Sequence, residues 1–429
     1  MMNKIIKERL ALIQSGTIPH GYKKTKAGIM PEDWDGAVRA KDVFKNHTDK
    51  KHNGDLEILA ATQENGIVPR SQIGIDIQCS EEGVNGYKKV SKGDFVISLR
   101  SFQGGIEYSE YDGIVSPAYT VLQPVREISD GYYRNYFKTD SFIQRLNGAI
   151  YGIRDGKQIG YQDFGDMCIY CPPIDEQKKI AEVLSCCDRV IKLKQQLIAE
   201  LQRLKSGFLQ SMFPVKGHSE PDIRFPEFSD TWEQRKFGEI TELKSASRVH
   251  KDEWTSNGVP FYRSSDVMAA INGTENEKAF ISEELYEKLS QVSGKLEEGD
   301  ILVTGGGSVG NPYIVPDNKP LYTKDADLLW IKNKGKFHPY FLYEFFFSPT
   351  FRNYLGSISH VGTIAHYTIT QLSETPICLP SFEEQKEVGE YFQSLDKLIT
   401  LHQRELEETK KKKKGLAKLL LTGSVRVPT

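Results

Sequence analysis

The sequence predicts an α+β fold: two similar globular α+β domains, joined and separated by two long antiparallel coiled-coil helices and related by a pseudo-twofold repeat. The stretch CPPIDEQKKI, which begins at Cys171, recurs as LPSFEEQKEV from Leu379. Each stretch opens a long helical register of apolar residues. Upstream, KKVSKGDFVISL and GKLEEGDILVTG each place a Gly-Asp turn before a short β-branched strand.

The composition is that of an ordinary globular protein. The chain has 429 residues, 38% of them hydrophobic and 27% charged, with a formal net charge of −2. No apolar run approaches the roughly 20 residues needed to span a bilayer. The first residues, MMNKIIKERLALIQSG, are charged and lack a signal-peptide stretch, and six cysteines do not make a disulfide framework in so long a chain. We therefore expect a reduced, cytoplasmic protein with no membrane association.

The helical register repeats in detail when Gln177 is aligned with Gln385, an offset of 208 residues. Apolar residues recur every three or four positions, which is typical of a coiled-coil stripe. Each helix is expected to run for about 40 residues, or roughly 60 Å. Pro214 ends the first helix, Gly423 caps the second, and Ser381 with Glu384 has the form of a capping box. The residues predicted to line the helix pair and subunit interface are Ile180, Leu184, Ile191, Ile198, Val388, Phe392, Ile399 and Leu406.

These elements divide the chain into seven parts. A short N-terminal echo, LALIQSGTI, resembles LLLTGSVRV at the other end, so the N-terminal segment is expected to dock near the C-terminal helix. The predicted parts are the N-terminal segment 1–30, the first domain 31–172, the central helix 173–213, a linker 214–225, the second domain 226–379, the distal helix 380–422 and a tail 423–429.

Matched frames around unlike interiors suggest one role performed on two different targets. A helix pair of fixed length would hold two such domains at a fixed spacing. DNA is a natural ligand for this arrangement, because half-sites one helical turn apart lie about 34 Å apart on one face of the duplex.

A family resemblance rests on these same stretches. PPIDEQKKIA with LKSGFLQSMF, then FPEFSDTWEQRKFGEI, and finally LPSFEEQKEV with LLTGSV, resemble the specificity subunits of type I restriction–modification systems. The resemblance covers essentially the whole chain. It implies two target-recognition domains that each read half of a split double-stranded DNA sequence. It also implies that the helices set the spacer and bind methyltransferase subunits.

The resemblance further implies a non-catalytic subunit of an adenine methyltransferase and endonuclease complex. Two methyltransferase (M) subunits are the expected partners, and two restriction (R) subunits join them in systems that also cleave; the sequence leaves open which kind this is. The chain itself is expected to bind no cofactor and no metal. S-adenosylmethionine, ATP and Mg are expected on the partner subunits.

Two other interpretations stay open, a self-contained DNA methyltransferase or nuclease and a coiled-coil scaffold that binds no DNA. Residues 306–310 fit the G-x-S-x-G pattern of an esterase, but the sequence that follows, NPYIVPDNKP, is unsuited to the helix that a nucleophile elbow requires. Asn311-Pro312-Tyr313 is only part of a methyltransferase motif. Cys168 and Cys171 have the spacing of a zinc pair, yet core packing is favoured. The lysine run 410–414 fits a solvated helix face or a docking surface equally well.

Base reading requires polar side chains on loops that reach the edges of base pairs. Such residues follow the Gly-Asp strands and lie near the ends of the two domains. The predicted DNA-binding residues are Arg100, Ser101, Gln103, Arg154, Lys157 and Gln158 in the first domain, and Arg263, Ser264, Gly306, Ser308, Thr363, His366 and Thr368 in the second.

Overall fold

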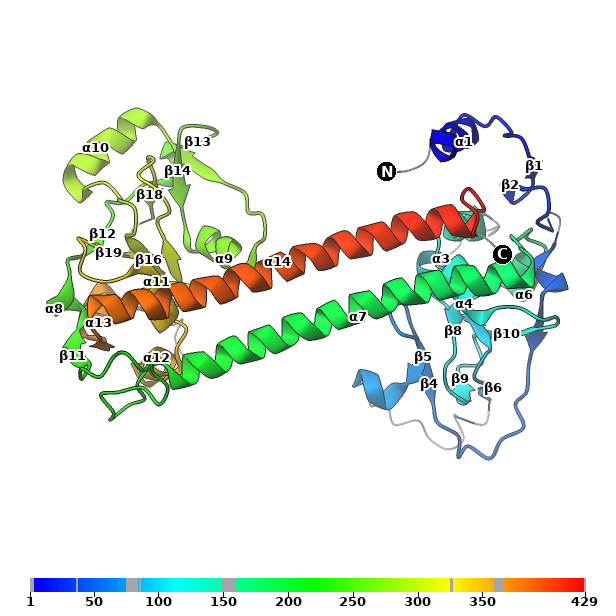
Figure 1. Cartoon of the computed structure of the whole chain (residues 1–429), viewed down its shortest axis with the longest axis horizontal. Helices are drawn as coiled ribbons and strands as arrows, with labels where there is room; N and C mark the ends of the chain where they lie inside the picture. Colours follow the sequence, from blue (N-terminus) through cyan, green and yellow to red (C-terminus); the bar gives the residue numbers. More distant parts are fainter. Residues whose placement is uncertain are drawn as a thin grey trace. The chain divides into compact units, whose positions relative to one another are not determined.

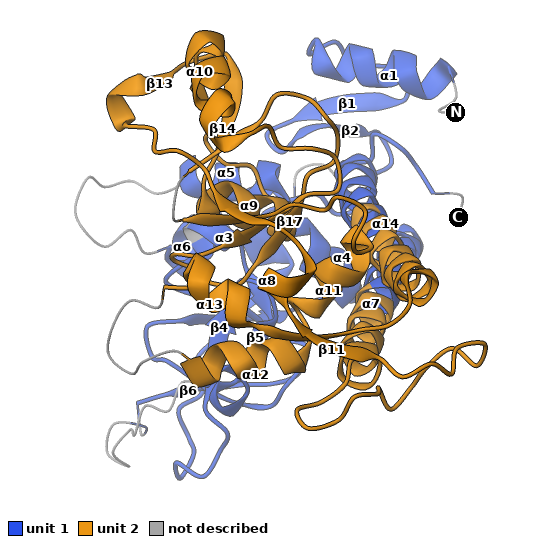
Figure 2. Cartoon of the chain, turned by 90° about the vertical axis from the view of Figure 1, so that its left-hand side faces the viewer, with its two compact units in different colours: residues 1–194, 405–429 blue, residues 195–404 orange. Residues whose placement is uncertain are grey.

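A computed structural model describes residues 4–35, 38–74, 84, 86–148, 159–324, 327–358 and 366–427. The chain divides into two compact units, residues 1–194 with 405–429 and residues 195–404 (Figure 2). The division falls within both long helices, α7 (Ile174–Ser211) and α14 (Phe382–Leu421). Each unit therefore contains part of each helix. No helix among the described residues combines the length and apolarity needed to cross a membrane.

Unit 1 combines short strands with small helices (Figure 1). Its elements before α7 are α1 (Lys4–Gln14), β1 (Tyr22–Thr25), β2 (Gly28–Pro31), β3 (Phe44–His47), β4 (Leu59–Thr62), β5 (Gly66–Pro69), β6 (Lys88–Val90), β7 (Phe95–Ile97), α3 (Ser101–Gly104), β8 (Glu107–Tyr108), β9 (Gly113–Val115), β10 (Thr120–Pro124), α4 (Asp130–Tyr136), α5 (Asp140–Gly148) and α6 (Tyr161–Gly165).

The centre of unit 1 is an antiparallel four-stranded sheet in the order β3-β10-β7-β8. The Phe44 and Phe95 rings project from this sheet and pack edge-to-face with their centroids 5.4 Å apart. The Phe44 ring packs in the same way against Tyr133 of α4, with a centroid distance of 5.1 Å. Such edge-to-face pairs are a preferred arrangement of aromatic rings. The two-stranded pairs β4–β5 and β6–β9 complete the unit.

Unit 2 repeats part of this plan and adds to it. Its elements between the helices are β11 (Glu233–Lys236), α8 (Phe237–Ile240), β12 (Leu243–Ser245), β13 (Trp254–Thr255), β14 (Val259–Tyr262), α9 (Ser264–Asn272), β15 (Ala279–Ile281), α10 (Glu283–Ser293), β16 (Ile301–Thr304), β17 (Pro312–Ile314), β18 (Tyr322–Thr323), β19 (Leu328–Ile331), α11 (Pro339–Phe345), α12 (Pro349–Ile358), α13 (Ile369–Glu374) and β20 (Pro376–Leu379).

The sheet β12-β19-β16-β17 of unit 2 has the same antiparallel order as the central sheet of unit 1. Unit 2 adds a second four-stranded sheet, β13-β15-β14-β18, whereas the described residues of unit 1 form the two-stranded pairs β4–β5 and β6–β9 besides their central sheet. The predicted α+β class with matched frames and unlike interiors is thus confirmed.

Both helices contribute to the core of each unit. In unit 1, Ile180 and Leu184 of α7 share a buried cluster with Leu420 and Leu421 of α14. In unit 2, Val388 and Phe392 of α14 share a buried cluster with Met212 and Phe213, which lie just beyond the end of α7. The apolar stripe of each helix is therefore used first to hold a globular domain.

Ion pairs fix the direction of the helices within each unit. In unit 1, Asp188 pairs with Lys413 at 2.5 Å and Lys194 with Glu405 at 2.7 Å. Because the numbers rise along α7 as they fall along α14, the two segments are antiparallel. In unit 2, Lys205 of α7 pairs with Asp396 of α14 at 2.7 Å.

The helix ends lie one or two residues inside the predicted bounds, since Met212 and Phe213 already belong to the turn before Pro214. The predicted capping box at Ser381 forms only in half. The Ser381 hydroxyl accepts a hydrogen bond from the Glu384 backbone nitrogen at 3.3 Å. The Glu384 carboxylate binds Arg224 instead.

The N-terminal segment touches the end of α14 through its hairpin. The Tyr22 hydroxyl donates a 2.8 Å hydrogen bond to the Gly423 carbonyl, and the Arg9 guanidinium lies 5.2 Å from the Tyr22 ring. Helix α1 itself has no buried residue.

Candidate nucleic-acid interface

The repeated Glu-Gln pair anchors each long helix to its domain. The Gln177 side chain accepts from the Ser129 backbone nitrogen at 3.0 Å and donates to the Pro172 carbonyl at 2.9 Å. In unit 2, Gln385 accepts from the His338 nitrogen at 3.0 Å and donates to the Pro380 carbonyl at 3.0 Å. Both amides are buried. The same two hydrogen bonds thus recur in both units.

The neighbouring glutamates bind an arginine that follows the other long helix. Glu176 accepts from two nitrogens of Arg426, at 2.6 and 2.7 Å, and from the Trp34 indole at 2.8 Å. Glu384 accepts from two nitrogens of Arg224 in the same way, at 2.6 and 2.7 Å. Both carboxylates are buried, so the arginines supply the charge that burial requires. The motif is therefore structural, and it fixes the frame from which the loops of each unit extend.

The Gly-Asp turns place a buried strand in front of each candidate reading loop. Gly93 has φ +101° and Gly299 has φ +84°, a region that favours glycine. The Asp94 carboxylate accepts from the Ser91 nitrogen at 2.8 Å, and Asp300 accepts from the Glu297 nitrogen at 3.0 Å. The strands β7 and β16 that follow are fully buried. The chain therefore leaves both cores at equivalent points, Arg100 and Gly306.

In unit 1 the predicted residues differ in their accessibility. Arg100 and Gln103 are exposed at the beginning and in the third position of α3. Ser101 is buried, and its hydroxyl accepts from the Ser98 nitrogen at 2.8 Å, so in this conformation it shapes the turn and is not available to a base. Arg154, Lys157 and Gln158 lie outside the described residues.

In unit 2 several predicted residues gather around Asp327. Its carbonyl accepts from the Ser264 hydroxyl at 3.0 Å and from the Gly305 nitrogen at 2.8 Å. A Cβ on Gly306 would lie 3.2 Å from the Asp327 carboxylate and 3.8 Å from the His366 ring. Four chain segments, which carry Ser264, Gly306, Asp327 and His366, thus meet at one place, and the His366 side chain there is exposed.

The other predicted residues of unit 2 have separate surroundings. Arg263 forms an ion pair with Asp266 at 2.9 Å, and its guanidinium lies 5.5 Å from the Trp254 ring. Thr368 caps α13. Ser308 is exposed in the turn that joins β16 to β17, which confirms that no helix follows the G-x-S-x-G stretch. Thr363 lies outside the described residues.

Two basic side chains of unit 1, Lys88 and Arg70, make contacts that the sequence does not predict. Lys88 donates to the Tyr119 carbonyl at 2.5 Å, and Arg70 binds Tyr87 nearby. These residues belong to different short strands and loops, so no local pattern marks them.

Each long helix also carries an exposed apolar pair. Val190 and Leu193 of α7 are 40% and 56% exposed, and Leu398 and Leu401 of α14 are 39% and 49% exposed. The first pair matches the second at the offset of 208 residues. These four residues are not among the predicted interface residues. Of the predicted ones that lie outside the two domain cores, Ile198, Ile399 and Leu406 are buried and Ile191 is half-buried. The helices thus have one apolar face turned inward and a repeated apolar patch turned to solvent.

Four of the five lysines in the run 410–414 form ion pairs. Lys413 binds Asp188 at 2.5 Å and Lys414 binds Asp140 at 3.0 Å in unit 1, while Lys410 and Lys412 pair with glutamates of α14 itself. The run therefore serves partly to tie α14 to α7 and α5.

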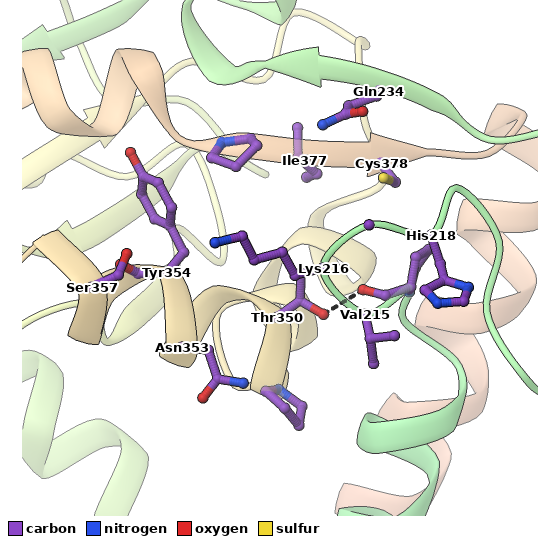
Figure 3. Close-up of a pocket in the computed structure, with 14 residues that line it drawn as sticks. Val215, Lys216, His218, Gln234, Thr350, Asn353, Tyr354, Ser357, Ile377 and Cys378 are labelled. Atoms are coloured by element: carbon purple, nitrogen blue, oxygen red, sulfur yellow. Dashed lines mark hydrogen bonds between the residues drawn. The ribbon is translucent and has the colours of Figure 1, made fainter.

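A cavity of about 300 Å³ opens in unit 2 between α12, the β11–β20 pair and the turn after α7 (Figure 3). The Lys216 side chain crosses it toward Tyr354, and the Thr350 hydroxyl binds the Pro214 carbonyl (Figure 3). Neither Lys216 nor Tyr354 is among the predicted DNA-binding residues. When α12 and α5 are aligned at their first residues, Pro349 and Asp140, Tyr354 corresponds to Arg145 of unit 1, which binds the Cys168 carbonyl at 2.8 Å.

The described residues contain no group of three or more His, Cys, Asp or Glu side chains that could hold a metal ion. Cys171 is buried against the core of unit 1, and Cys168 packs beside it. The predicted core role of these two cysteines fits this placement.

Comparison with known proteins gives one family. Residues 31–203 and 229–411 each match the family model described as the type I restriction modification DNA specificity domain. Over 426 residues the chain is 26% identical to the type I restriction enzyme MjaVIII specificity subunit of Methanocaldococcus jannaschii, covering 95% of this chain and 96% of that protein. The MjaIX specificity subunit of the same organism is 21% identical over 434 residues, with 95% and 96% covered.

Two solved structures share the fold. A chain from the study of complex assembly and conformational transition of the type I R-M system has a TM-score of 0.61 at 16% identity, covering 92% of this chain and 99% of that one. The crystal structure of the HsdS subunit from Thermoanaerobacter tengcongensis has a TM-score of 0.51 at 16% identity, with 95% and 98% covered.

Proposed function

This chain belongs to the type I restriction–modification DNA specificity family, and we propose that its two recognition domains each read one half of a bipartite DNA target. The observation that carries the proposal is the contrast between frame and loops. The same Glu-Gln anchors and Gly-Asp strands recur in both units, while the loops that leave the strands differ. One supporting structure that presents two different surfaces suits two different half-sites.

We propose that base reading falls to the exposed polar residues at the ends of β7 and β16. In unit 1 these are Arg100 and Gln103. Arginine can bind guanine through two hydrogen bonds, and glutamine can bind adenine likewise. In unit 2 the group around Asp327 offers the exposed His366, whereas the half-buried Ser264 donates its hydroxyl to the Asp327 carbonyl.

We propose that the long helices set the number of unread base pairs between the half-sites. Each is continuous, with 38 residues in α7 and 40 in α14. A continuous helix is a stiff element of about 1.5 Å per residue, so its length is a defined distance.

We propose that two methyltransferase subunits dock on the repeated apolar pairs, one on Val190 and Leu193 and one on Leu398 and Leu401. Exposed apolar patches on a helix are typical of interaction sites. Because the pairs are equivalent in the two repeats, they suit two copies of the same partner. Restriction subunits would join this complex in a system that cleaves.

We propose further that this chain has no catalytic centre of its own and works in the cytoplasm. S-adenosylmethionine would bind to the methyltransferase subunits, and ATP and Mg to the restriction subunits. Adenine methylation would then follow from where the specificity subunit places its partners on the DNA.

The test is methylation-sensitive sequencing of DNA from cells that carry this chain with its methyltransferase partner. The expected result is one bipartite motif with a methylated adenine in each half and a fixed unread spacer. Cells with the methyltransferase alone are the control and should show no such motif. A purified chain that transfers methyl groups by itself would support a self-contained enzyme, and a complex with no sequence preference would support a scaffold.

A further inference from the structure

The turn that joins β16 to β17 in unit 2 is held in one shape by its own hydrogen bonds. The Thr304 hydroxyl donates to the Ser308 carbonyl and accepts from the Asn311 nitrogen at 2.9 Å. The Asn311 side chain donates to the same Ser308 carbonyl at 2.7 Å, and the Gly310 nitrogen donates to the Thr304 carbonyl at 2.7 Å. Gly307 and Ser308 are exposed at the tip. The turn therefore presents Ser308 to solvent from a defined position.

Arg352 of α12 binds this turn from the side of the core. Its guanidinium donates to Asn311 Oδ1 at 3.0 Å and to the Val309 carbonyl at 3.3 Å. The guanidinium also lies 5.4 Å from the centre of the Phe347 ring and 5.7 Å from that of Phe351. Among the described residues, both hydrogen-bond acceptors of this half-buried cation belong to the turn. The cation thus replaces its lost hydration with contacts to the turn.

The turn also lies in close contact with α12 at Gly310. This residue has φ +76°, and a Cβ there would lie 2.8 Å from Leu355 and 2.9 Å from Phe351. Glycine is therefore required for the turn to approach the helix so closely. Arg352 lies on the same helix between these two residues in sequence. An apolar contact and a polar contact thus both fix the exposed tip relative to the core.

Unit 1 has a cation with the same kind of contact, supplied from another place in the chain. Lys138 lies in the turn between α4 and α5, and its ammonium donates to the Gly104 carbonyl at the end of α3 at 2.9 Å. It also pairs with the buried Glu107 at 2.5 Å. When the two Gly-Asp turns are aligned, Gly104 corresponds to Gly310, the residue after Val309. Each cation therefore binds a backbone carbonyl at nearly the same point of the loop that leaves the Gly-Asp strand.

We propose that Arg352 and Lys138 are positioning residues for sequence recognition, which hold the reading loops of their own units in the shape that fits the half-site. The inference rests on the proposed function and deepens it. Arg352 would act through the turn that carries Ser308, and Lys138 through the helix that carries Arg100 and Gln103. Hydrogen bonds weaken steeply when their angle or length is wrong, so a displaced loop loses base contacts even when its own residues are intact.

The test uses the purified complex of this chain with its methyltransferase subunits. Affinity is measured, over a series of NaCl concentrations, for a duplex with the methylated motif, for duplexes with one base pair changed in either half, and for an unrelated duplex. The half that unit 1 reads is the one that changes when residues 35–170 are exchanged for another first domain. Thermal unfolding of each variant shows whether it folds.

Two variants remove the contacts without leaving a buried charge unpaired. Arg352→Met removes both hydrogen bonds to the turn and keeps an apolar stem against Phe351. Lys138→Met is combined with Glu107→Gln, because the buried carboxylate would otherwise lose its partner. The control is Lys295→Met, which removes one positive charge from an exposed ion pair of unit 2.

Arg352→Met should lower the discrimination against base changes in the half that unit 2 reads by roughly tenfold, and leave the other half as it was. The Lys138 double variant should do the reverse. The slope of log affinity against log salt should stay the same, because no phosphate contact is lost. Arg352→Lys, which restores a donor, should recover part of the discrimination. The control should keep the discrimination of both halves.

Several results would overturn the positioning role. Full discrimination in a folded Arg352→Met complex is one, and an equal loss in both halves is another. A reduced salt slope, with the same loss of affinity for the motif and the unrelated duplex, would make Arg352 a phosphate contact. If Arg352→Met does not fold, Asn311→Ala decides, because it removes the acceptor side of the same contact, and full discrimination there would refute the role. An unaltered complex with no sequence preference would instead refute the proposed function itself.

Discussion

The guanidinium of Arg426 binds the buried carboxylate of Glu176 through two nitrogens, at 2.6 and 2.7 Å, across 250 residues of sequence. Arg224 and Glu384 repeat this pair in unit 2. Arg426 follows α14, which begins in unit 2, and Arg224 follows α7, which begins in unit 1. In each unit, therefore, the buried glutamate is paired with an arginine that follows the long helix beginning in the other unit.

Arg426→Ala should destabilise unit 1 by about 3 kcal/mol, because removal of one partner leaves a buried charge unpaired. Arg224→Ala should do the same in unit 2. Urea unfolding of the purified chain measures both. The control is Arg203→Ala, whose exposed ion pair with Glu200 should contribute less than about 1 kcal/mol. Equal losses from all three variants would mean that burial of the carboxylate does not matter.

A second prediction concerns Glu344, which is buried against Lys205 and Asp396 at the junction of α11 with both long helices. Burial raises the pKa of Glu344 to about 8, with Lys205 lowering it and Asp396 raising it. The folded protein thus binds a proton that the unfolded chain releases near pH 4.5. The stability from this proton is fully present below that value and is lost as the pH rises through about 8.

Glu344→Gln should therefore flatten the loss of stability between pH 6 and pH 9, with a gain at pH 9 of roughly 1–2 kcal/mol over the unaltered chain. Chemical unfolding at both pH values is the measurement. When α11 and α4 are aligned at their first residues, Glu344 corresponds to Asn135 of unit 1, so the Lys413–Asp188 pair there has no buried glutamate beside it. Asp188→Asn is therefore the control and should leave the pH dependence of stability unchanged. A steeper pH dependence in Glu344→Gln would show that the glutamate is ionised in the folded state.

A third prediction concerns the exposed apolar pairs. Leu193→Asp and Leu401→Asp should each fold normally, since both leucines are about half exposed. Each should lower the number of bound methyltransferase subunits from two to one, and the double variant should bind none. Native mass spectrometry gives the count. Val292→Asp is the matched control, because Val292 is 79% exposed on α10. Full assembly of the double variant would place the partners elsewhere.

Recognition by halves is the fourth prediction. Replacing residues 35–170 with the first domain of another family member should change one half of the methylated motif and leave the other half and the spacer as they were. The anchors Glu176 and Gln177 stay in place in this exchange, so the frame is kept. Sequencing of methylated DNA reads the result, and a simultaneous change in both halves would disprove independent reading.

The fifth prediction concerns the spacer. Lys194 and Glu405 face each other across the helix pair, so four residues inserted after Lys194 and four before Glu405 lengthen both helices at one level. The added length is about 6 Å, and four residues nearly preserve the apolar stripe. With base pairs rising about 3.4 Å each, the spacer should grow by one or two base pairs while both half-sites stay unchanged. An active variant with the original spacer would exclude the helices as its determinant.

The helices and the repeat could be predicted because their signal is local and periodic. Ile180 and Leu184 lie on one stripe of a continuous helix, and the same stripe recurs at Val388 and Phe392. The observed ends of the two helices differ from the predicted ends by only one or two residues. Differences of this size are usual where a helix gives way to a turn.

The loops of the recognition domains could not be predicted to the same degree. Ser101 was proposed for base contact from its place after a strand, but a one-turn helix folds its hydroxyl back onto Ser98. Lys88 binds the Tyr119 carbonyl, a contact between two residues 31 positions apart that the pairing of short strands makes possible. Pairing of this kind depends on tertiary packing and leaves no mark in neighbouring residues.

The anchors at Glu176 and Glu384 also bear on how new specificities arise in genes. Each anchor is a short stretch with the same Glu-Gln-Lys core, and it lies directly after a recognition domain. A crossover between two related genes within that stretch would deliver a foreign domain with its supporting contacts already complete. The recombinant chain would fold at once and recognise a new half-site, without a series of weakened intermediates. Sequence recognition would then be inherited as an exchangeable cassette, and the methyltransferase partner would need no matching change.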